Sequence, residues 1–353
     1  MLLFLTISGG MYGLGAAMGA PKAQRWALIF VLFVAVVGIL LVFPEDHALR
    51  SAFGGNAEPY LLLGGFAALV LIYRAILLRL RARVDTGSQT QEPQKGSFSA
   101  TELDRYARHI VLREIGGPGQ KKLKNAKVLV IGAGGLGAPA LQYLAAAGVG
   151  LIGVIDDDTV ENANLQRQVI HRDEDIGLLK VFSAQNAMLA QNPHIEVRPY
   201  HRRLTEQIAS ELFEEYDVIL DGTDNFETRY LVNETAARVG KPLISGALSQ
   251  WEGQLSVFDP ESGTPCYQCI FPGAPAPELA PSCAEAGVIG PLPGVIGAMM
   301  AQEAIKLITG AGSVLRSEML IYDGLYGETR KMTLKPRADC PICSHRRNLW
   351  HAP

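Results

Sequence analysis

The stretch KVLVIGAGGLGAPALQYLAAAGVGLIGVIDDD, residues 127–158, decides the fold of this chain of 353 residues. It begins with a short run rich in Val and Ile, turns through G-A-G-G-L-G, and continues into a small-residue segment that favours helix. A second apolar run at residues 151–155 ends at Asp156. Strand, glycine turn, helix and strand in this order predict a parallel α/β sheet that binds a nucleotide at the turn.

The glycine turn predicts a phosphate-binding site. Glycines let backbone N–H groups approach a phosphate at a helix N-terminus, where unpaired donors and the helix dipole favour negative charge. An acid at the end of the second strand, Asp156, is suitably positioned to bind ribose hydroxyls. This pattern alone leaves NAD and ATP both open. The glycines expected to contact the nucleotide are Gly132, Gly134, Gly135 and Gly137.

The N-terminal region differs in composition from the rest of the chain, because its first seventy-three positions hold only six charged residues. Three apolar stretches, at about residues 1–21, 26–43 and 59–78, predict two or three membrane helices, since a bilayer core takes about 20 residues of helix. The first is rich in glycine, and a cleaved signal peptide is the alternative for it. Arginines at 79, 81 and 83 follow the third stretch. By the positive-inside rule, the chain is a multi-pass protein of the inner (cytoplasmic) membrane with its globular part in the cytoplasm.

A globular domain is expected at residues 100–353, after a membrane segment at 1–83 and a polar linker at 84–99. Strand-like runs alternate with helical segments, which predicts a Rossmann-like, doubly wound and mostly parallel sheet with an antiparallel C-terminal extension. The net charge of −3 gives no basic surface, so no nucleic-acid partner is expected.

Polar residues follow the predicted strands at the edge where open α/β sheets bind ligands. Asp224 and Asn225 lie in the turn D-G-T-D-N after a buried strand, where Asp221 is expected only to cap the turn. Taken singly, Arg167 and Lys180 could equally be solvent-exposed cations. The full set of candidates is Asp156, Asp158, Asn164, Leu165, Gln166, Arg167, Lys180, Asp224 and Asn225.

Four of the five cysteines form two C-x-x-C pairs: Cys266 with Cys269, and Cys340 with Cys343. Two such pairs fit a tetrahedral structural zinc site, and a cytosolic location argues against disulfides. A thioredoxin-like redox pair is the alternative, disfavoured because neither pair begins a helix after a strand. The fifth cysteine, Cys283, lies in a proline-rich run that is expected to form a loop across the active-site face.

Together the motifs resemble those of a known family. G-A-G-G-L-G, D-D-D-T-V, N-L-Q-R-Q, D-G-T-D-N, C-Y-Q-C, S-C-A-E-A-G-V and C-P-I-C occur in the order found in the ThiF/MoeB/HesA adenylyltransferases, relatives of ubiquitin-activating enzymes. The resemblance spans about residues 101–345 and is greatest to the MoeB-type members. It implies ATP and Mg²⁺ rather than NAD. It also implies adenylation of the C-terminal glycine of a small ubiquitin-like sulfur carrier ending in Gly-Gly, of the molybdopterin-synthase or thiamine-pathway type.

The resemblance also implies roles for individual residues. Arg167 and Lys180 would contact the triphosphate and Asp224 would hold Mg²⁺. Asp156 would bind the ribose, and Asn164 the ribose or phosphates. These five residues form the expected ATP site.

Two further residues acquire roles from the family. Arg108 would reach across a homodimer interface to the neighbour's ATP, although the helix predicted at residues 101–113 suggests by itself only a solvated face. Cys283 matches a thiol that serves covalent transfer in some members, and an inert loop thiol is the alternative. Because ten residues follow Cys343, sulfur is expected to come from a separate donor.

Three other functions stay open. The fold could serve as a membrane-anchored scaffold that binds nucleotide without turnover. The enzyme could instead activate a different acyl substrate, for example in tRNA modification or peptide maturation. A dinucleotide oxidoreductase fits least, because an NAD enzyme needs no such set of cations.

Overall fold

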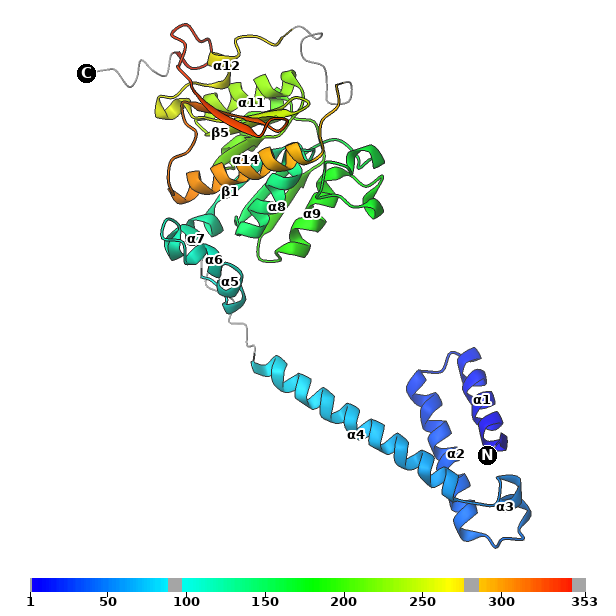
Figure 1. Ribbon diagram of the computed structural model, residues 1–353. Coiled ribbons are helices and arrows are strands. Elements are labelled where there is room, and N and C mark those ends of the chain that lie inside the picture. Colours follow the sequence, from blue (N-terminus) through cyan, green and yellow to red (C-terminus); the bar gives the residue numbers. More distant parts are fainter. Residues whose placement is uncertain (1, 88–96, 276–285, 345–353) are drawn as a thin grey trace. The chain divides into compact units, whose positions relative to one another are not determined.

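The computed structural model describes residues 2–87, 97–275 and 286–344 (Figure 1). The chain divides into two compact units, Met1–Glu92 and Pro93–Pro353. The first unit contains the helices α1 (Leu2–Ala17), α2 (Lys22–Val42), α3 (Ala48–Ala52) and α4 (Glu58–Gly87).

A small core of apolar and aromatic side chains joins the helices of the first unit. Phe4 of α1 and Leu40 of α2 are buried in it, and the Tyr60 hydroxyl donates to the Phe53 carbonyl at 3.0 Å. By length and composition α2 and the first part of α4 are candidate membrane spans. With 16 residues, α1 is shorter than the roughly 20 that cross a bilayer core. The structure therefore offers two candidate spans, within the two or three that the sequence predicts.

Helix α4 extends further than expected, to Gly87, where residues 84–99 were predicted to be a linker. Its last apolar turns are followed by Leu, Arg and Ala, which are strong helix formers. The helix therefore continues after the apolar run has ended. Residues 88–96 of the expected linker lie outside the described residues.

An eight-stranded sheet forms the centre of the second unit, in the order β3-β2-β1-β4-β5-β6-β7-β8 (Figure 1). Strands β1 to β5 pair in parallel, and β6, β7 and β8 are added antiparallel. This confirms the predicted parallel sheet with an antiparallel extension. The strands are β1 (Lys127–Ile131), β2 (Leu151–Ile155), β3 (Glu196–Tyr200), β4 (Val218–Asp221), β5 (Leu243–Leu248), β6 (Glu252–Phe258), β7 (Glu318–Asp323) and β8 (Glu328–Thr333).

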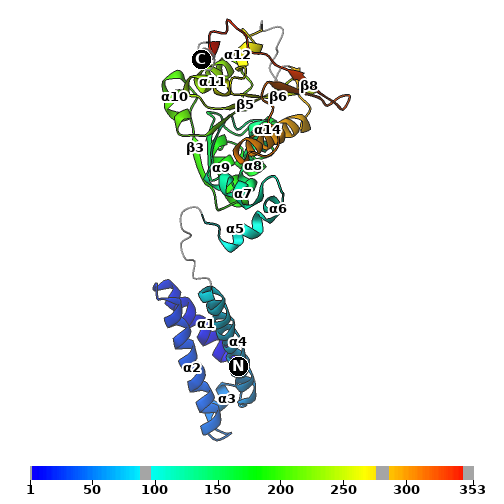
Figure 2. The ribbon, with the colours of Figure 1, turned by 90° about the vertical axis from the view of Figure 1, so that its left-hand side faces the viewer.

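Helices cover both faces of the parallel part (Figures 1 and 2). Side chains alternate along β1, so Val128 and Val130 belong to one core and Leu129 and Ile131 to the other. On the first face lie α8 (Gly137–Ala147), α9 (Lys180–Gln191) and α14 (Pro291–Thr309). On the second lie α10 (Glu206–Glu214), α11 (Phe226–Val239) and α12 (Tyr267–Ile270). Three short 3₁₀ turns complete the unit: η1 (Asn162–Asn164), η2 (Asp173–Asp175) and η3 (Pro260–Ser262).

The helix expected at 101–113 is broken into two, α5 (Ala100–Arg105) and α6 (Ala107–Ile110), which precede α7 (Gly116–Asn125). The break occurs at Tyr106, whose buried ring packs against Gly148 and whose hydroxyl accepts a hydrogen bond from the Asn192 amide at 2.8 Å. Tertiary packing of this tyrosine thus overrides the local helical pattern.

Candidate functional site

A cavity of about 1090 Å³ opens at the carboxyl ends of the parallel strands. The glycine loop after β1 forms one wall, and the acids after β2 and the turn after β4 form others. Further wall residues come from the segment after β3, the end of β5, and the segments next to α12 and before α14. This is the edge at which the sequence predicts a nucleotide.

Three of the four predicted glycines line the cavity, and the fourth has a packing role. Gly132, Gly134 and Gly135 are part of the wall, with Gly132 at a φ of 91° that favours glycine. Gly137 instead begins α8, and a Cβ added to it would overlap the carbonyl oxygen of Gly132. The missing side chain of Gly137 thus allows the close approach of helix and loop, and its contact with a nucleotide remains a prediction.

Asp156 is fixed beside the glycine loop. Its Oδ2 accepts a hydrogen bond from the Ala133 N–H at 2.7 Å, and its Oδ1 accepts one from the Asp158 N–H at 2.8 Å. Burial raises the pKa of Asp156, while Lys180 and the two backbone donors oppose that rise. The carboxylate therefore has a fixed orientation at the ribose end of the expected site.

The two predicted cations both line the cavity but differ in their surroundings. Lys180 is buried, and its Nζ lies 2.6 Å from Oδ2 of the largely exposed Asp158. Arg167 is half-buried, and its Nη1 donates to the Ala163 carbonyl at 3.0 Å. Lys180 is therefore already charge-paired, and a phosphate would have to compete with Asp158 for it.

Three other residues of the N-L-Q-R-Q segment were also predicted to contact the nucleotide. Among the described residues, Asn164, Leu165 and Gln166 are not part of the cavity wall. The buried Asn164 side chain accepts a hydrogen bond from the Glu161 N–H at 3.2 Å. In this structure it closes its own turn, since that acceptor is needed to satisfy the 3₁₀ turn η1.

The turn after β4 presents Asp224 and Asn225 to the cavity. Asn225 also caps α11, because its side chain accepts from the Thr228 N–H at 2.9 Å. Asp221 is fully buried and accepts from the N–H and hydroxyl of Thr223, at 3.1 and 2.6 Å. As predicted, Asp221 holds the turn and the exposed Asp224 faces the cavity.

Several residues of the wall were missed by the sequence reasoning. Arg202 and Arg203 directly follow β3 and line the cavity, and Arg203 pairs with Glu227 at 2.9 Å. Gln168 is buried in the wall, and its Oε1 has no hydrogen-bond partner in the described part of the chain. For Arg202 and Arg203, the sequence did offer a signal, because two adjacent arginines follow a predicted strand at the ligand-binding edge.

Arg108 and Cys283 are two further predicted site residues. Arg108 is exposed on α6 and is absent from the described cavity wall. Cys283 lies outside the described residues. The role of Arg108 across a subunit interface thus remains a prediction.

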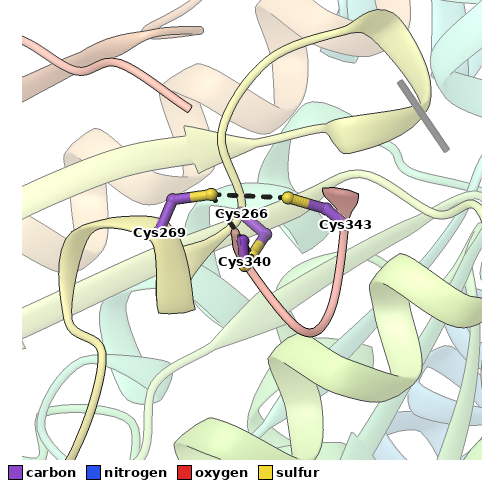
Figure 3. Close-up of side chains that lie close together, drawn as sticks. All are labelled: Cys266, Cys269, Cys340 and Cys343. Carbon is purple, nitrogen blue, oxygen red and sulfur yellow. Dashed lines mark hydrogen bonds between the residues drawn. The ribbon is translucent and has the colours of Figure 1, made fainter. Parts of the chain in front are cut away.

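The four paired cysteines gather into one cluster, although the two pairs are far apart in sequence (Figure 3). The Sγ atoms of Cys266 and Cys340 are 3.5 Å apart, and those of Cys269 and Cys343 are 3.4 Å apart. All four are buried, and their sulfurs lie within 4.8 Å of one another. Four tetrahedral Zn–S bonds of about 2.3 Å would separate the sulfurs by about 3.8 Å. The cluster has the size of such a site.

The charge state of the cysteines also favours a cation. The contact with the Cys269 thiol, followed by that with Cys343 and by burial, raises the pKa of the Cys266 thiol. Four buried thiolates cannot coexist without a compensating positive charge. A divalent metal ion supplies that charge and stabilises the thiolates.

Fold and cavity together define a nucleotide-binding α/β protein of the doubly wound class. Comparison with known proteins specifies it further. The model of the ThiF family matches residues 106–342, and the chain belongs to this family.

Named relatives agree with this membership. A sulfur carrier protein adenylyltransferase of Thermus thermophilus is 49% identical over 251 residues, which cover 70% of this chain and 92% of that protein. A SAMP-activating enzyme E1 of Haloferax volcanii is 45% identical over 247 residues, covering 70% and 91%. The probable adenylyltransferase/sulfurtransferase MoeZ of Mycobacterium tuberculosis is 49% identical, but this chain spans only 63% of it.

Solved structures share the fold. E. coli MccB described with MccA-N7isoASN gives a TM-score of 0.61 at 24% identity, covering 71% of this chain and 77% of MccB. E. coli MccB with ATP gives a TM-score of 0.57 at 25% identity, covering 64% and 69%.

Proposed function

We propose that this chain uses ATP to adenylate the C-terminal glycine carboxylate of a small ubiquitin-like sulfur carrier and releases pyrophosphate. The observation that carries the proposal is the composition of a single cavity. It combines a glycine loop, a ribose-type acid, two cations and an exposed carboxylate: Gly134, Asp156, Arg167, Lys180 and Asp224. A relative named as a sulfur carrier protein adenylyltransferase, at 49% identity, supports this substrate class.

The cavity residues match what the reaction requires. A carboxylate oxygen of the carrier attacks the α-phosphorus, the bond between that phosphorus and the bridging oxygen breaks, and pyrophosphate leaves. Negative charge on the phosphates is stabilised by fixed cations. Arg167 and Lys180 supply these cations. For this, the Lys180 ammonium leaves its ion pair with Asp158 and binds a phosphate oxygen. Asp156 holds the ribose so that the triphosphate lies over the glycine loop.

Asp224 is the residue that we assign to Mg²⁺. Its side chain is exposed at the cavity and makes no hydrogen bond or ion pair within the described residues. Its oxygens are thus free to bind a hard cation that prefers oxygen ligands. Mg²⁺ bound there with the phosphates would neutralise part of their charge.

We also propose that the active form is a homodimer in which Arg108 serves the neighbouring ATP site. Arg108 is exposed on α6, away from the cavity of its own chain. Tyr106 and Asn192 hold this region onto the second unit through buried contacts. The side chain of Arg108 is therefore exposed on a well-packed segment, where it could contact a second subunit.

Carrier-dependent exchange of pyrophosphate into ATP tests the adenylation proposal. Arg167→Ala and Asp224→Ala are each expected to lower exchange about a hundredfold or more, since loss of one stabilising group in a transition state costs about 10²–10³. Arg172→Ala is the matched control, because this exposed arginine is close in sequence but outside the cavity wall. Undiminished exchange in the first two variants would remove both residues from the mechanism.

The same assay tests the dimer. Arg108→Ala is expected to lose exchange when alone and to regain part of it when mixed with Arg167→Ala, because a mixed dimer holds one intact composite site. Absence of any regain after subunit mixing would contradict action across an interface.

For the cysteine cluster we propose a structural zinc ion held by Cys266, Cys269, Cys340 and Cys343. All four ligands are thiolates in a buried site, which leaves no open coordination position. The ion would tie the C-terminal strand region to the segment at α12.

Zinc content of the purified protein tests this site. We expect about one zinc ion per chain, lost in Cys266→Ser and in Cys343→Ser with a lowered unfolding temperature, because structural zinc contributes directly to folding. Cys283→Ser is the control and should keep its zinc. A wild-type protein that is fully folded and free of zinc would contradict the assignment.

We further propose that α2 and α4 cross the inner membrane and that the second unit is cytoplasmic. The apolar side chains of both helices are largely exposed, including Phe30 and Val34 of α2 and Phe66 and Leu69 of α4. Such surfaces are unfavourable in water. A lipid environment would cover them.

Cell fractionation tests this localisation. The full chain is expected in the membrane fraction after alkaline carbonate washing, and a chain that begins at Pro93 is expected in the soluble fraction. A full chain that appears in the soluble fraction would show that these helices do not insert.

A further inference from the structure

A buried histidine that is not part of the described cavity wall contacts the glycine loop. His171 is 6% exposed, and its Nε2 lies 3.0 Å from the carbonyl oxygen of Ala133. A carbonyl oxygen only accepts hydrogen bonds, so Nε2 must carry a proton.

The ring is held in this orientation by α9. Its Nδ1 lies 2.8 Å from Oγ of the buried Ser183, and that hydroxyl lies 2.7 Å from Oδ2 of Asp175. The same Oδ2 accepts from the Arg172 N–H at 3.1 Å. Because Ser183 occupies the Nδ1 side, the imidazole presents Nε2 to the loop.

This contact fixes the direction of a peptide group in the phosphate loop. The peptide between Ala133 and Gly134 is planar and trans, so its carbonyl and its N–H point in opposite directions. With the carbonyl held by His171, the Gly134 N–H points away from the histidine, on the side where Gly134 lines the cavity. Within the described part of the chain this N–H has no acceptor.

The neighbouring donor is already used. The Ala133 N–H donates to Asp156, so Ala133 is held at both its N–H and its carbonyl. The Gly134 N–H is therefore a donor that remains for an anionic ligand. A phosphate oxygen of a nucleotide is the acceptor that this position would take.

We propose that His171 is a positioning residue for phosphate binding: it holds the Ala133–Gly134 peptide so that the Gly134 N–H faces a phosphate of the bound nucleotide. This inference rests on the proposed use of ATP and adds a residue that does not itself line the cavity. Ser183 and Asp175 act through it by orienting the ring.

Calorimetric titration of the full chain with ATP and, separately, with adenosine tests this role. His171→Leu removes the donor and is expected to raise the Kd for ATP about tenfold, the size of one net hydrogen bond. The Kd for adenosine should be unchanged, because adenosine has no phosphate. His171→Gln, whose amide can donate from the position of Nε2, should bind ATP within about twofold of wild type.

Ser183→Ala provides a second variant that leaves the histidine in place. It removes the group that orients the ring, and a two- to fivefold rise in the Kd for ATP is expected, again without a change for adenosine. If His171→Leu does not fold, Ser183→Ala and His171→Gln decide the question.

An equal rise in the Kd for ATP and the Kd for adenosine in these variants would overturn the proposal, because it would show that His171 has only a general structural role. Unchanged ATP binding in His171→Leu or, if that variant does not fold, in Ser183→Ala would overturn it as well. A wild-type chain that binds ATP but exchanges no pyrophosphate would overturn the proposed adenylation alone, since the binding comparison does not depend on turnover.

Discussion

The site depends on the close approach of three backbone segments at the carboxyl ends of β1, β2 and β4. Gly132 and Gly137 permit it, because a side chain at either position would press on a neighbouring carbonyl. Asp156 then ties the end of β2 to the loop through the Ala133 N–H at 2.7 Å. Every cation and acid of the cavity is positioned relative to this junction.

Two kinds of ion pair lie at the cavity: one that a bound ligand can open and one that holds the structure together. Lys180 is buried beside Asp158, whose carboxylate is 65% exposed and can return to water when a phosphate takes the lysine. Asp221 and Arg229 form the opposite case, because both are buried and both hold Thr223 in the turn. The first pair is suited to binding, whereas the second is part of the scaffold.

Local sequence predicted the sheet and much of the site because glycine turns and strand ends impose strong constraints. It failed where tertiary contacts decide. The helix predicted at residues 101–113 is broken at Tyr106, which packs on Gly148. His171 was missed because its partner Ala133 is 38 positions away and no spacing rule connects them.

The most direct test of the account is a crystal structure of the chain with ATP and Mg²⁺. The account predicts the ribose on Asp156, a phosphate within hydrogen-bonding distance of the Gly134 N–H, and the Lys180 ammonium moved from Asp158 to the triphosphate. A nucleotide bound elsewhere, or one that leaves Lys180 on Asp158 with no phosphate beside the glycine loop, would contradict it.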